Sequence, residues 1–168
     1  QYAKEKGFVK TLAEKNGGRK GNIEKIIGAV NVWFWGKGKG DFARELKASG
    51  ISKAIFSSAD WDVQSINELG YLTSVYDIYQ DVWPPVYHEV TKRHDGWPED
   101  LVLDQKGDWV RGWTIKKGLK EYPGGVVCSI RGLDRAKKDI PEKLKKNPYT
   151  ARFIDTTTSS PWRECYNP

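Results

Sequence analysis

The stretch Ile26–Trp35 reads IIGAVNVWFW and is an almost continuous run of apolar, β-branched and aromatic residues. A run without polar alternation is typical of a strand buried on both faces, as the strands of a parallel sheet are. The run stops at the glycine-rich segment Gly36–Gly40, where a turn is expected. This stretch therefore predicts the first strand of a parallel sheet.

Strand and helix patterns alternate on both sides of this stretch. Before it, Tyr2–Lys15 has apolar residues at helical spacing. After it, Asp41 is expected to cap a helix, and Gly50 and Gly70 stand where two helical patterns end. Strands separated by helices predict a parallel α/β architecture. The expected elements after Asp41 are helix Phe42–Ala48, strand Ile51–Ser57, helix Asp60–Leu69, strand Tyr71–Tyr79, helix Asp134–Lys145 and strand Tyr149–Asp155.

A long insertion of about residues 82–130 follows the third expected strand. Its short apolar runs Leu101–Leu103 and Trp109–Trp113 flank Gln105–Asp108 and predict a β-hairpin. The order is then β-α-β-α-β-insertion-α-β, with about four βα units, which is half of an eight-stranded barrel. We expect residues 1–168 to form one partial TIM-type (β/α) barrel domain, a half-barrel with the hairpin inserted. A small open α/β sheet is the alternative.

The composition argues against several kinds of partner. A chain of 168 residues suffices for one domain, and no apolar run approaches the roughly 20 residues that span a bilayer. The N-terminus has no apolar segment of a signal peptide, and the absence of methionine is typical of a mature product or an excised piece. The net charge is +6, but 28 basic residues are interspersed with 22 acidic ones. We therefore expect neither a membrane nor a nucleic acid as a partner.

The cysteines and histidines do not predict a metal site. Cys128 and Cys165 lack metal-ligand spacing, and His88 and His94 lie in the insertion, where a surface role is expected. The cysteines could pair if the protein is exported, or remain two buried thiols. No cofactor is expected either, because Gly36–Gly40 lacks the spacing of phosphate-binding loops and is predicted to be a flexible turn.

Side chains suited to a sugar follow every expected strand. Barrels and open α/β sheets bind ligands at the carboxyl ends of their strands. The chain has eight Trp and eight Tyr residues, more than a core of this size needs, and their flat amphipathic rings suit sugar faces. The expected substrate-binding residues are Trp33, Trp35, Asp60, Tyr76, Asp77, Tyr79, Asp81 and Thr156.

Asp155 is the leading candidate for chemistry. It follows Phe153-Ile154 and precedes the hydroxyl-rich run Thr156–Thr158, so its carboxylate is expected at the mouth of the site. The alternative is that Asp155 caps the next turn through a threonine. Asp77 has an alternative of its own, an ion pair with a buried Lys or Arg.

Three segments resemble a known family. They are Ile26–Trp35 (IIGAVNVWFW), Gly70–Pro85 (GYLTSVYDIYQDVWPP) and Arg152–Pro168 (RFIDTTTSSPWRECYNP). They are similar to bacterial glycoside hydrolases related to endo-α-N-acetylgalactosaminidase, of the family 101 and family 129 type. The resemblance spans almost the whole chain and reaches the fourth strand of the catalytic barrel of that family.

The resemblance implies a retaining hydrolase that acts on an α-linked glycan such as an α-N-acetylgalactosaminide. The nucleophile of the family, an Asp at the end of strand four, corresponds to Asp155. Tyr76 and Asp77 would then hold substrate hydroxyls, and Trp33 and Trp35 would form pocket walls. A second carboxyl about 5 Å away, with a raised pKa, would donate the proton.

The resemblance leaves the acid/base unassigned. The family carries this residue on the next strand, beyond Pro168, and Glu164 is a weak candidate in an expected loop. We therefore expect the isolated chain to be inactive unless a second chain or the other half of the barrel completes it and covers its sheet edges. The resemblance also implies a periplasmic or secreted bacterial protein with a glycan substrate.

Two further functions are alternatives. A non-catalytic carbohydrate-binding module would use the same Trp and Tyr residues, but Asp155 would be dispensable while loss of Trp33 would weaken sugar binding. A basic nucleic-acid-binding domain would show affinity that falls steeply with salt, and no motif supports it.

Overall fold

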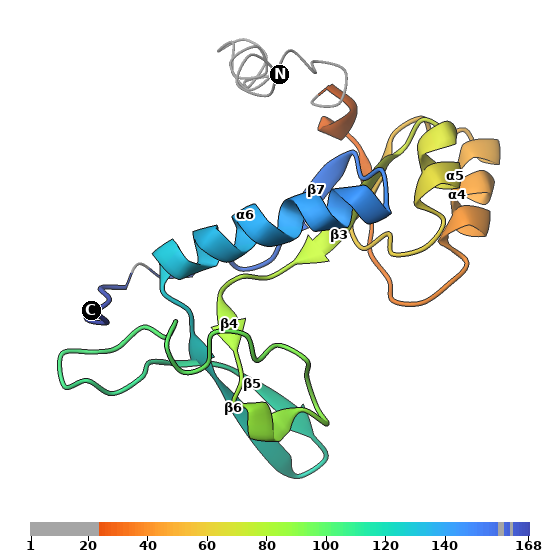
Figure 1. Ribbon diagram of the computed structural model, residues 1–168. Coiled ribbons are helices and arrows are strands. Elements are labelled where there is room, and N and C mark those ends of the chain that lie inside the picture. The colour runs from red at the N-terminus through yellow and green to blue at the C-terminus, as the bar shows by residue number, and fades with distance from the viewer. Residues whose placement is uncertain (1–23, 158–159, 162) are drawn as a thin grey trace. The chain divides into compact units, whose positions relative to one another are not determined.

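The computed structural model describes residues 24–157, 160–161 and 163–168 (Figure 1). The helix expected at Tyr2–Lys15 lies outside the described residues. The chain divides into two compact units, of which the first ends at Asp77 and also contains Lys143–Phe153. The second unit comprises Ile78–Glu142 and Ile154–Pro168.

A parallel sheet forms the centre of the first unit. Its strand order in the described part of the chain is β1-β2-β3-β7, with Asn31 opposite Ile55 and Ile55 opposite Leu72. The amide of Thr150, just before β7, donates to the carbonyl of Thr73 at 3.1 Å. The strands are β1 (Val30–Val32), β2 (Ala54–Phe56), β3 (Leu72–Asp77) and β7 (Ala151–Ile154).

The first strand is shorter and more exposed than its sequence suggests. Only Val30–Val32 of the apolar run Ile26–Trp35 pair in the sheet, and Ile26 and Val30 are 49% and 44% exposed. Burial on both faces was therefore a wrong prediction for β1. The reason is its place at the edge of the described sheet, where it has β2 on one side alone.

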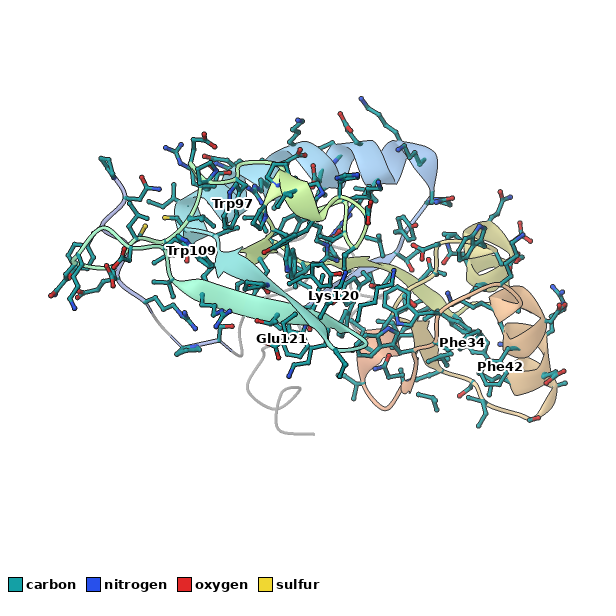
Figure 2. All side chains as sticks on the ribbon, turned by 90° about the horizontal axis from the view of Figure 1, so that it is seen from below. Phe34, Phe42, Trp97, Trp109, Lys120 and Glu121 are labelled. Carbon is teal, nitrogen blue, oxygen red and sulfur yellow. The ribbon has the colours of Figure 1, made fainter. Side chains whose placement is uncertain are left out.

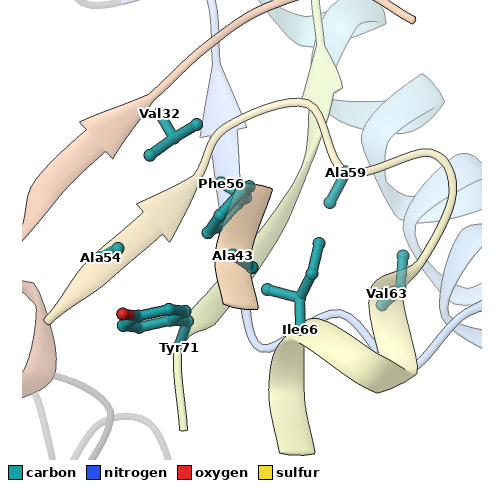
Figure 3. Packing of buried hydrophobic residues seen from close by; sticks show 8 residues of the cluster. All are labelled: Val32, Ala43, Ala54, Phe56, Ala59, Val63, Ile66 and Tyr71. Carbon is teal, nitrogen blue, oxygen red and sulfur yellow. The ribbon is translucent and has the colours of Figure 1, made fainter. Parts of the chain in front are cut away.

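Two helices close one hydrophobic core in this unit. They are α4 (Lys39–Ala48) and α5 (Val63–Glu68), which run side by side in Figure 1. Phe56 of β2, Ala43 of α4 and Ile66 of α5 are completely buried (Figure 3). Full burial of a side chain the size of Phe56 or Ile66 stabilises a fold by about 1.5–3 kcal/mol.

The start of α4 differs from the prediction. The residue before the helix is Gly38, with a left-handed φ of +86°, and Asp41 lies inside the first turn, where it pairs with Arg44. Asp41 is therefore not the N-cap. Its carboxylate still stabilises the helix, because a negative charge in the first turn faces the positive end of the helix dipole.

An antiparallel sheet characterises the second unit. The strands β4 (Asp81–Val82), β5 (Arg111–Lys117) and β6 (Lys120–Val126) lie in the order β4-β6-β5. A short 3-10 helix, η1 (Pro85–Tyr87), follows β4. The inserted β structure that the sequence predicts after the third strand is confirmed, and β5 and β6 form its main hairpin (Figure 1).

The main hairpin is not the predicted one. The runs Leu101–Leu103 and Trp109–Trp113 do pair next to the predicted turn, through a bridge between Leu103 and Trp109 and a hydrogen bond from the amide of Val110 to the carbonyl of Val102 at 2.9 Å. Trp97 packs edge-on against Trp109 (Figure 2). The long ladder turns instead at Gly118, whose φ is +61°. Lys120 and Glu121 begin its return strand (Figure 2).

Glycines in β6 explain why sequence patterning missed this strand. A β-carbon on Gly124 would lie 2.8 Å from Cε2 of Trp83, and one on Gly125 would lie 2.6 Å from Cδ2 of Leu101. Glycine is a poor strand former, but here it allows large side chains to pack onto the backbone. Pro123 beside them weakens the strand pattern further.

The long helix α6 (Ser129–Lys146) begins five residues before its predicted start at Asp134, and Pro141 lies within it. No helix in the described part of the chain has the length and apolar character needed to cross a bilayer. The protein is thus mixed α/β, with a parallel four-stranded sheet and a small antiparallel sheet. Closure of the parallel sheet into a half-barrel stays a prediction.

Candidate functional site

Four aromatic rings cluster in the first unit. The ring centroids of Trp33 and Phe153 lie 5.1 Å apart, and Tyr76 stacks on Phe153 at 5.8 Å with an interplanar angle of 25°. Trp35 meets Tyr76 edge-on at 5.4 Å. We call Trp33, Trp35, Tyr76 and Phe153 the aromatic platform.

The strand ends explain how this platform forms. Trp33 follows the last residue of β1, while Tyr76 and Phe153 are the next-to-last residues of β3 and β7. Parallel strands end at the same edge of a sheet, so rings far apart in the sequence meet there. Trp33 and Trp35 remain 48% and 65% exposed. Rings that are held by neighbours and still open to solvent are suited to stacking on a flat, partly apolar ligand.

Asp77 is buried and directly follows Tyr76 of the aromatic platform. Its side chain is completely buried and forms ion pairs with Lys143 of α6 and Arg152 of β7, one at each carboxylate oxygen. This is the ion-pair role that the sequence left open as the alternative. Direct contact between Asp77 and a sugar hydroxyl would require one of the two cations to release its oxygen, so that role stays a prediction.

Lys39 is a buried cation that sequence patterning missed. Its side chain is 1% exposed, and its Nζ donates to the carbonyl oxygen of Ser58, after β2, at 2.6 Å. The ring centroids of Phe34 and Trp61 lie 5.3 and 5.7 Å from Nζ. The predicted turn therefore ends before Lys39, because Lys39 is the first residue of α4.

Acidic residues surround this lysine. Burial lowers the pKa of Lys39, and the negative charges of Asp60 and Asp62 act in the opposite direction. Asp60 is exposed, and Oδ2 of Asp62 accepts the amide of Gly40 at 3.1 Å. Asp60 therefore acts on Lys39 in this structure, and its predicted contact with a substrate is untested.

A second group of candidate residues lies in the other unit, around Asp81. Asp81 is the first residue of β4 and is 7% exposed, and its Oδ1 accepts the amide of Trp113 at 3.3 Å. Burial raises the pKa of the Asp81 carboxyl and the charge of Asp155 adds to this, whereas the Trp113 amide and the charges of Arg93 and Arg163 oppose it. The negative charge of Asp155 therefore acts on the Asp81 carboxyl.

Asp155 directly follows β7 and is half-buried. The chain turns sharply at Thr156, whose φ of +59° is unusual for a β-branched residue. The hydroxyl of Thr156 and the amide of Thr157 donate to the backbone carbonyl of Asp155 at 2.9 and 2.8 Å. This turn holds the backbone that carries the predicted nucleophile.

The remaining predicted residues lie elsewhere in the second unit. Glu164 is exposed, and its Oε2 accepts the hydroxyl of Tyr166 at 2.5 Å. Tyr79 is half-buried and lines a groove of about 670 Å³. Nδ1 of His94 lies 3.1 Å from the carbonyl oxygen of Trp83. Within residues 24–157, 160–161 and 163–168, no group of three or more His, Cys, Asp or Glu could hold a metal ion.

The structure thus groups some of the predicted residues and separates others. Trp33, Trp35 and Tyr76 share the aromatic platform, whereas Asp60 lies beside Lys39 instead. The fourth platform residue, Phe153, was not among the expected binding residues. Its position two residues before Asp155 on the last strand is the sequence signal that could have identified it.

Comparisons with known proteins give a likeness in structure alone. No protein-family model matches the chain, and no curated protein matches its sequence significantly. The α-N-acetylgalactosaminidase NagBb from Bifidobacterium bifidum, solved in complex with GalNAc, aligns with 99% of this chain and 34% of its own at a TM-score of 0.67 and 15% identity. The same enzyme with Gal-NHAc-DNJ aligns with 99% and 33%, at a TM-score of 0.65 and 15% identity.

These structures show that the chain has a fold similar to part of a glycoside hydrolase. The chain spans about a third of the length of the solved structures it matches. The likeness agrees with the glycoside hydrolase part of the sequence resemblance. The particular family stays a prediction.

Proposed function

We propose that this chain is part of a retaining glycoside hydrolase that acts on an α-linked glycan of the N-acetylgalactosaminide type. The observation that carries the proposal is the aromatic platform, an open ring surface at strand ends in a fold similar to that of an α-N-acetylgalactosaminidase. The sequence resemblance through the aromatic-Ile-Asp strand and the YDxYxD strand supports the same class of substrate.

Asp155 has the role of nucleophile in this proposal. Its carboxylate attacks the anomeric carbon, and a covalent glycosyl-enzyme forms as the glycosidic bond breaks. A carboxylic acid protonates the leaving oxygen and then, as a base, activates the water that hydrolyses the intermediate. Glu164 remains a weak candidate for this acid, because it is exposed and bonded to Tyr166.

The platform has the role of binding the sugar. The exposed faces of Trp33 and Trp35 offer an apolar surface to the C–H groups of a pyranose ring, and Tyr76 supports both rings from within the cluster. An aromatic surface of this kind binds the sugar without taking part in bond breaking. Its contribution is therefore measured as affinity.

The test is hydrolysis of 4-nitrophenyl α-N-acetylgalactosaminide by the longest natural chain that contains these residues. Asp155→Asn should lower kcat by at least about 10³-fold, because the nucleophile is lost while its shape is kept. Asp108→Asn, at an exposed turn of the second unit, is the matched control and should leave kcat unchanged. Azide should restore turnover to Asp155→Ala by replacing the missing nucleophile. Full activity of Asp155→Asn would remove Asp155 from this role.

A carbohydrate-binding module is the second candidate, because exposed Trp rings alone suffice for it. In that case no form of the protein would hydrolyse the glycoside. N-acetylgalactosamine would still bind, Asp155→Asn would bind it equally well, and Trp33→Ala would bind it more weakly.

A further inference from the structure

Asn31 lies on the same face of the parallel sheet as the aromatic platform. Side chains alternate between the two faces along a strand. Val32 of β1 is 7% exposed and packs in the core with Phe56 (Figure 3), so its neighbours Asn31 and Trp33 point to the opposite face. Trp33 contacts the other platform rings on that face. Asn31 therefore precedes the platform by one strand repeat of two residues.

A hydrogen bond fixes the carboxamide group of Asn31. The hydroxyl of Ser57, directly after β2, donates to Oδ1 of Asn31 at 2.5 Å. Ser57 is itself held, because it is 2% exposed and its amide donates to the carbonyl of Val32 at 3.0 Å. Val32 lies opposite Phe56, so Ser57 stands one residue further along the sheet. The carboxamide of Asn31 therefore leans toward the carboxyl ends of the strands, where the platform lies.

This bond leaves the nitrogen of the carboxamide available to a ligand. A carboxamide has one acceptor oxygen and two N–H donors on its nitrogen. Asn31 is exposed, and within the part of the chain that the structure describes its Nδ2 has no hydrogen-bond partner. Asn31 thus presents donors, and not an acceptor, to the space beside the platform.

A fixed pair of donors next to a ring-stacking surface fits a sugar that carries an amide carbonyl. A carbonyl oxygen accepts hydrogen bonds and does not donate them, whereas a hydroxyl does both. The step from Asn31 to Trp33 along the strand is roughly 7 Å. An acetamido group extends beyond the rim of a pyranose ring farther than a hydroxyl does. The ring can therefore stack on the platform while this substituent reaches back toward Asn31.

We propose that Asn31 determines specificity for a 2-acetamido sugar, by donating a hydrogen bond from Nδ2 to the carbonyl oxygen of the acetamido group. This inference rests on the proposed role of the platform in sugar binding. Ser57 is a positioning residue, because it holds Oδ1 and so turns Nδ2 toward the ligand. A galactose ring stacks equally well on the platform but lacks the carbonyl that Asn31 recognises.

The experiment compares N-acetylgalactosamine with galactose by titration calorimetry, on the longest natural chain that contains these residues. One neutral hydrogen bond contributes about 0.5–1.5 kcal/mol, which is about two- to tenfold in affinity. The wild type should therefore bind N-acetylgalactosamine more tightly than galactose by a factor in this range. The ratio of the two affinities is the readout, because a variant with a damaged fold loses affinity for both sugars together.

Asn31→Asp is the decisive variant. It keeps the shape of the side chain and an acceptor for the Ser57 hydroxyl, but it replaces the donors by a negatively charged oxygen. The ratio should fall to about one or below, with little change in the affinity for galactose. Gln64→Glu, at an exposed position on α5, makes the same change of group elsewhere in the first unit and should leave both affinities unchanged.

Ser57→Ala tests the same bond without altering Asn31. The carboxamide becomes free to rotate, so the ratio should fall part of the way toward one. An unchanged ratio in both variants, or a wild type that binds the two sugars equally, would overturn the role of Asn31 and leave sugar binding by the platform in place. A wild type that binds neither sugar would instead overturn the proposed function, and this inference with it.

Discussion

Arg152 of β7 forms an ion pair with the buried carboxylate of Asp77, the last residue of β3, across 75 positions of the sequence. Lys143 occupies the other oxygen of the same carboxylate. Asp77 is completely buried, and the side chain of Arg152 is 15% exposed. This pair therefore joins two neighbouring strands of the parallel sheet through charges that solvent does not screen.

Replacing Arg152 by methionine should destabilise the first unit. The substitution leaves the Asp77 carboxylate with one cation instead of two, and breaking a buried pair on one side costs about 3–5 kcal/mol. The second cation, Lys143, should keep the loss near the lower end of this range. Chemical denaturation followed by tryptophan fluorescence measures it.

Arg44→Met is the matched control for that experiment. Arg44 pairs with Asp41 on α4, but the side chains are 58% and 79% exposed. Exposed pairs contribute about 0–1 kcal/mol, so the control should stay close to the wild-type stability. Equal losses for the two variants would contradict the structural role of the Asp77 ion pairs.

Asp81→Asn should change how stability depends on pH. The pKa of Asp81 is raised above its ordinary value of 3.8 in the folded protein, chiefly by burial. A carboxyl with a raised folded pKa stabilises the fold below pH 3.8, and this contribution is lost as the pH rises through the folded pKa. Asparagine does not titrate, so it lacks this loss.

The unfolding free energies of the wild type and of Asp81→Asn are therefore compared at about pH 3.5 and pH 7, by urea denaturation. The wild type minus variant difference should fall as the pH rises. A difference that stays constant or increases would show that burial does not disfavour the charged form of Asp81.

Lys39→Met should destabilise the first unit although it keeps the apolar stem of the side chain. The buried carbonyl of Ser58 would lose its charged donor and keep the amide of Asp60, and a hydrogen bond to a charged group contributes about 1.5–3 kcal/mol. The two cation–ring contacts with Phe34 and Trp61 would be lost as well. Thermal unfolding measures the change. Lys37→Met, at an exposed position two residues earlier, should have little effect, and a comparable loss there would assign the effect to the turn instead.

Trp35→Ala should weaken binding of N-acetylgalactosamine if the aromatic platform binds sugars. Truncation of a tryptophan at the centre of a contact typically costs more than about 1 kcal/mol, which is about fivefold in affinity. Titration calorimetry measures it. Trp113→Ala removes a ring that is 69% exposed on β5 of the second unit and should leave the affinity unchanged. An equal loss for both variants would argue against the platform as the binding surface.

Local patterns predicted the first unit well. The alternation from β1 to β3 follows from short apolar runs separated by glycines, and Gly50 and Gly70 both have a positive φ just after a helix. The patterns failed at β6, where Pro123, Gly124 and Gly125 resemble a turn. Their role depends on Trp83 and Leu101, which lie far from them in the sequence, and no local rule contains that information.

The candidate functional residues also divide into those that the local sequence identified and those that only the fold revealed. The sequence by itself determined which side chains follow the strands, because the end of an apolar run marks the end of a strand. Only the tertiary structure decided that Asp77 pairs with Lys143 and Arg152 and that Lys39 is buried. Each of these contacts joins residues distant in the chain. Their energies depend on burial and on opposite charges meeting in space, and these conditions exist only once the chain has folded.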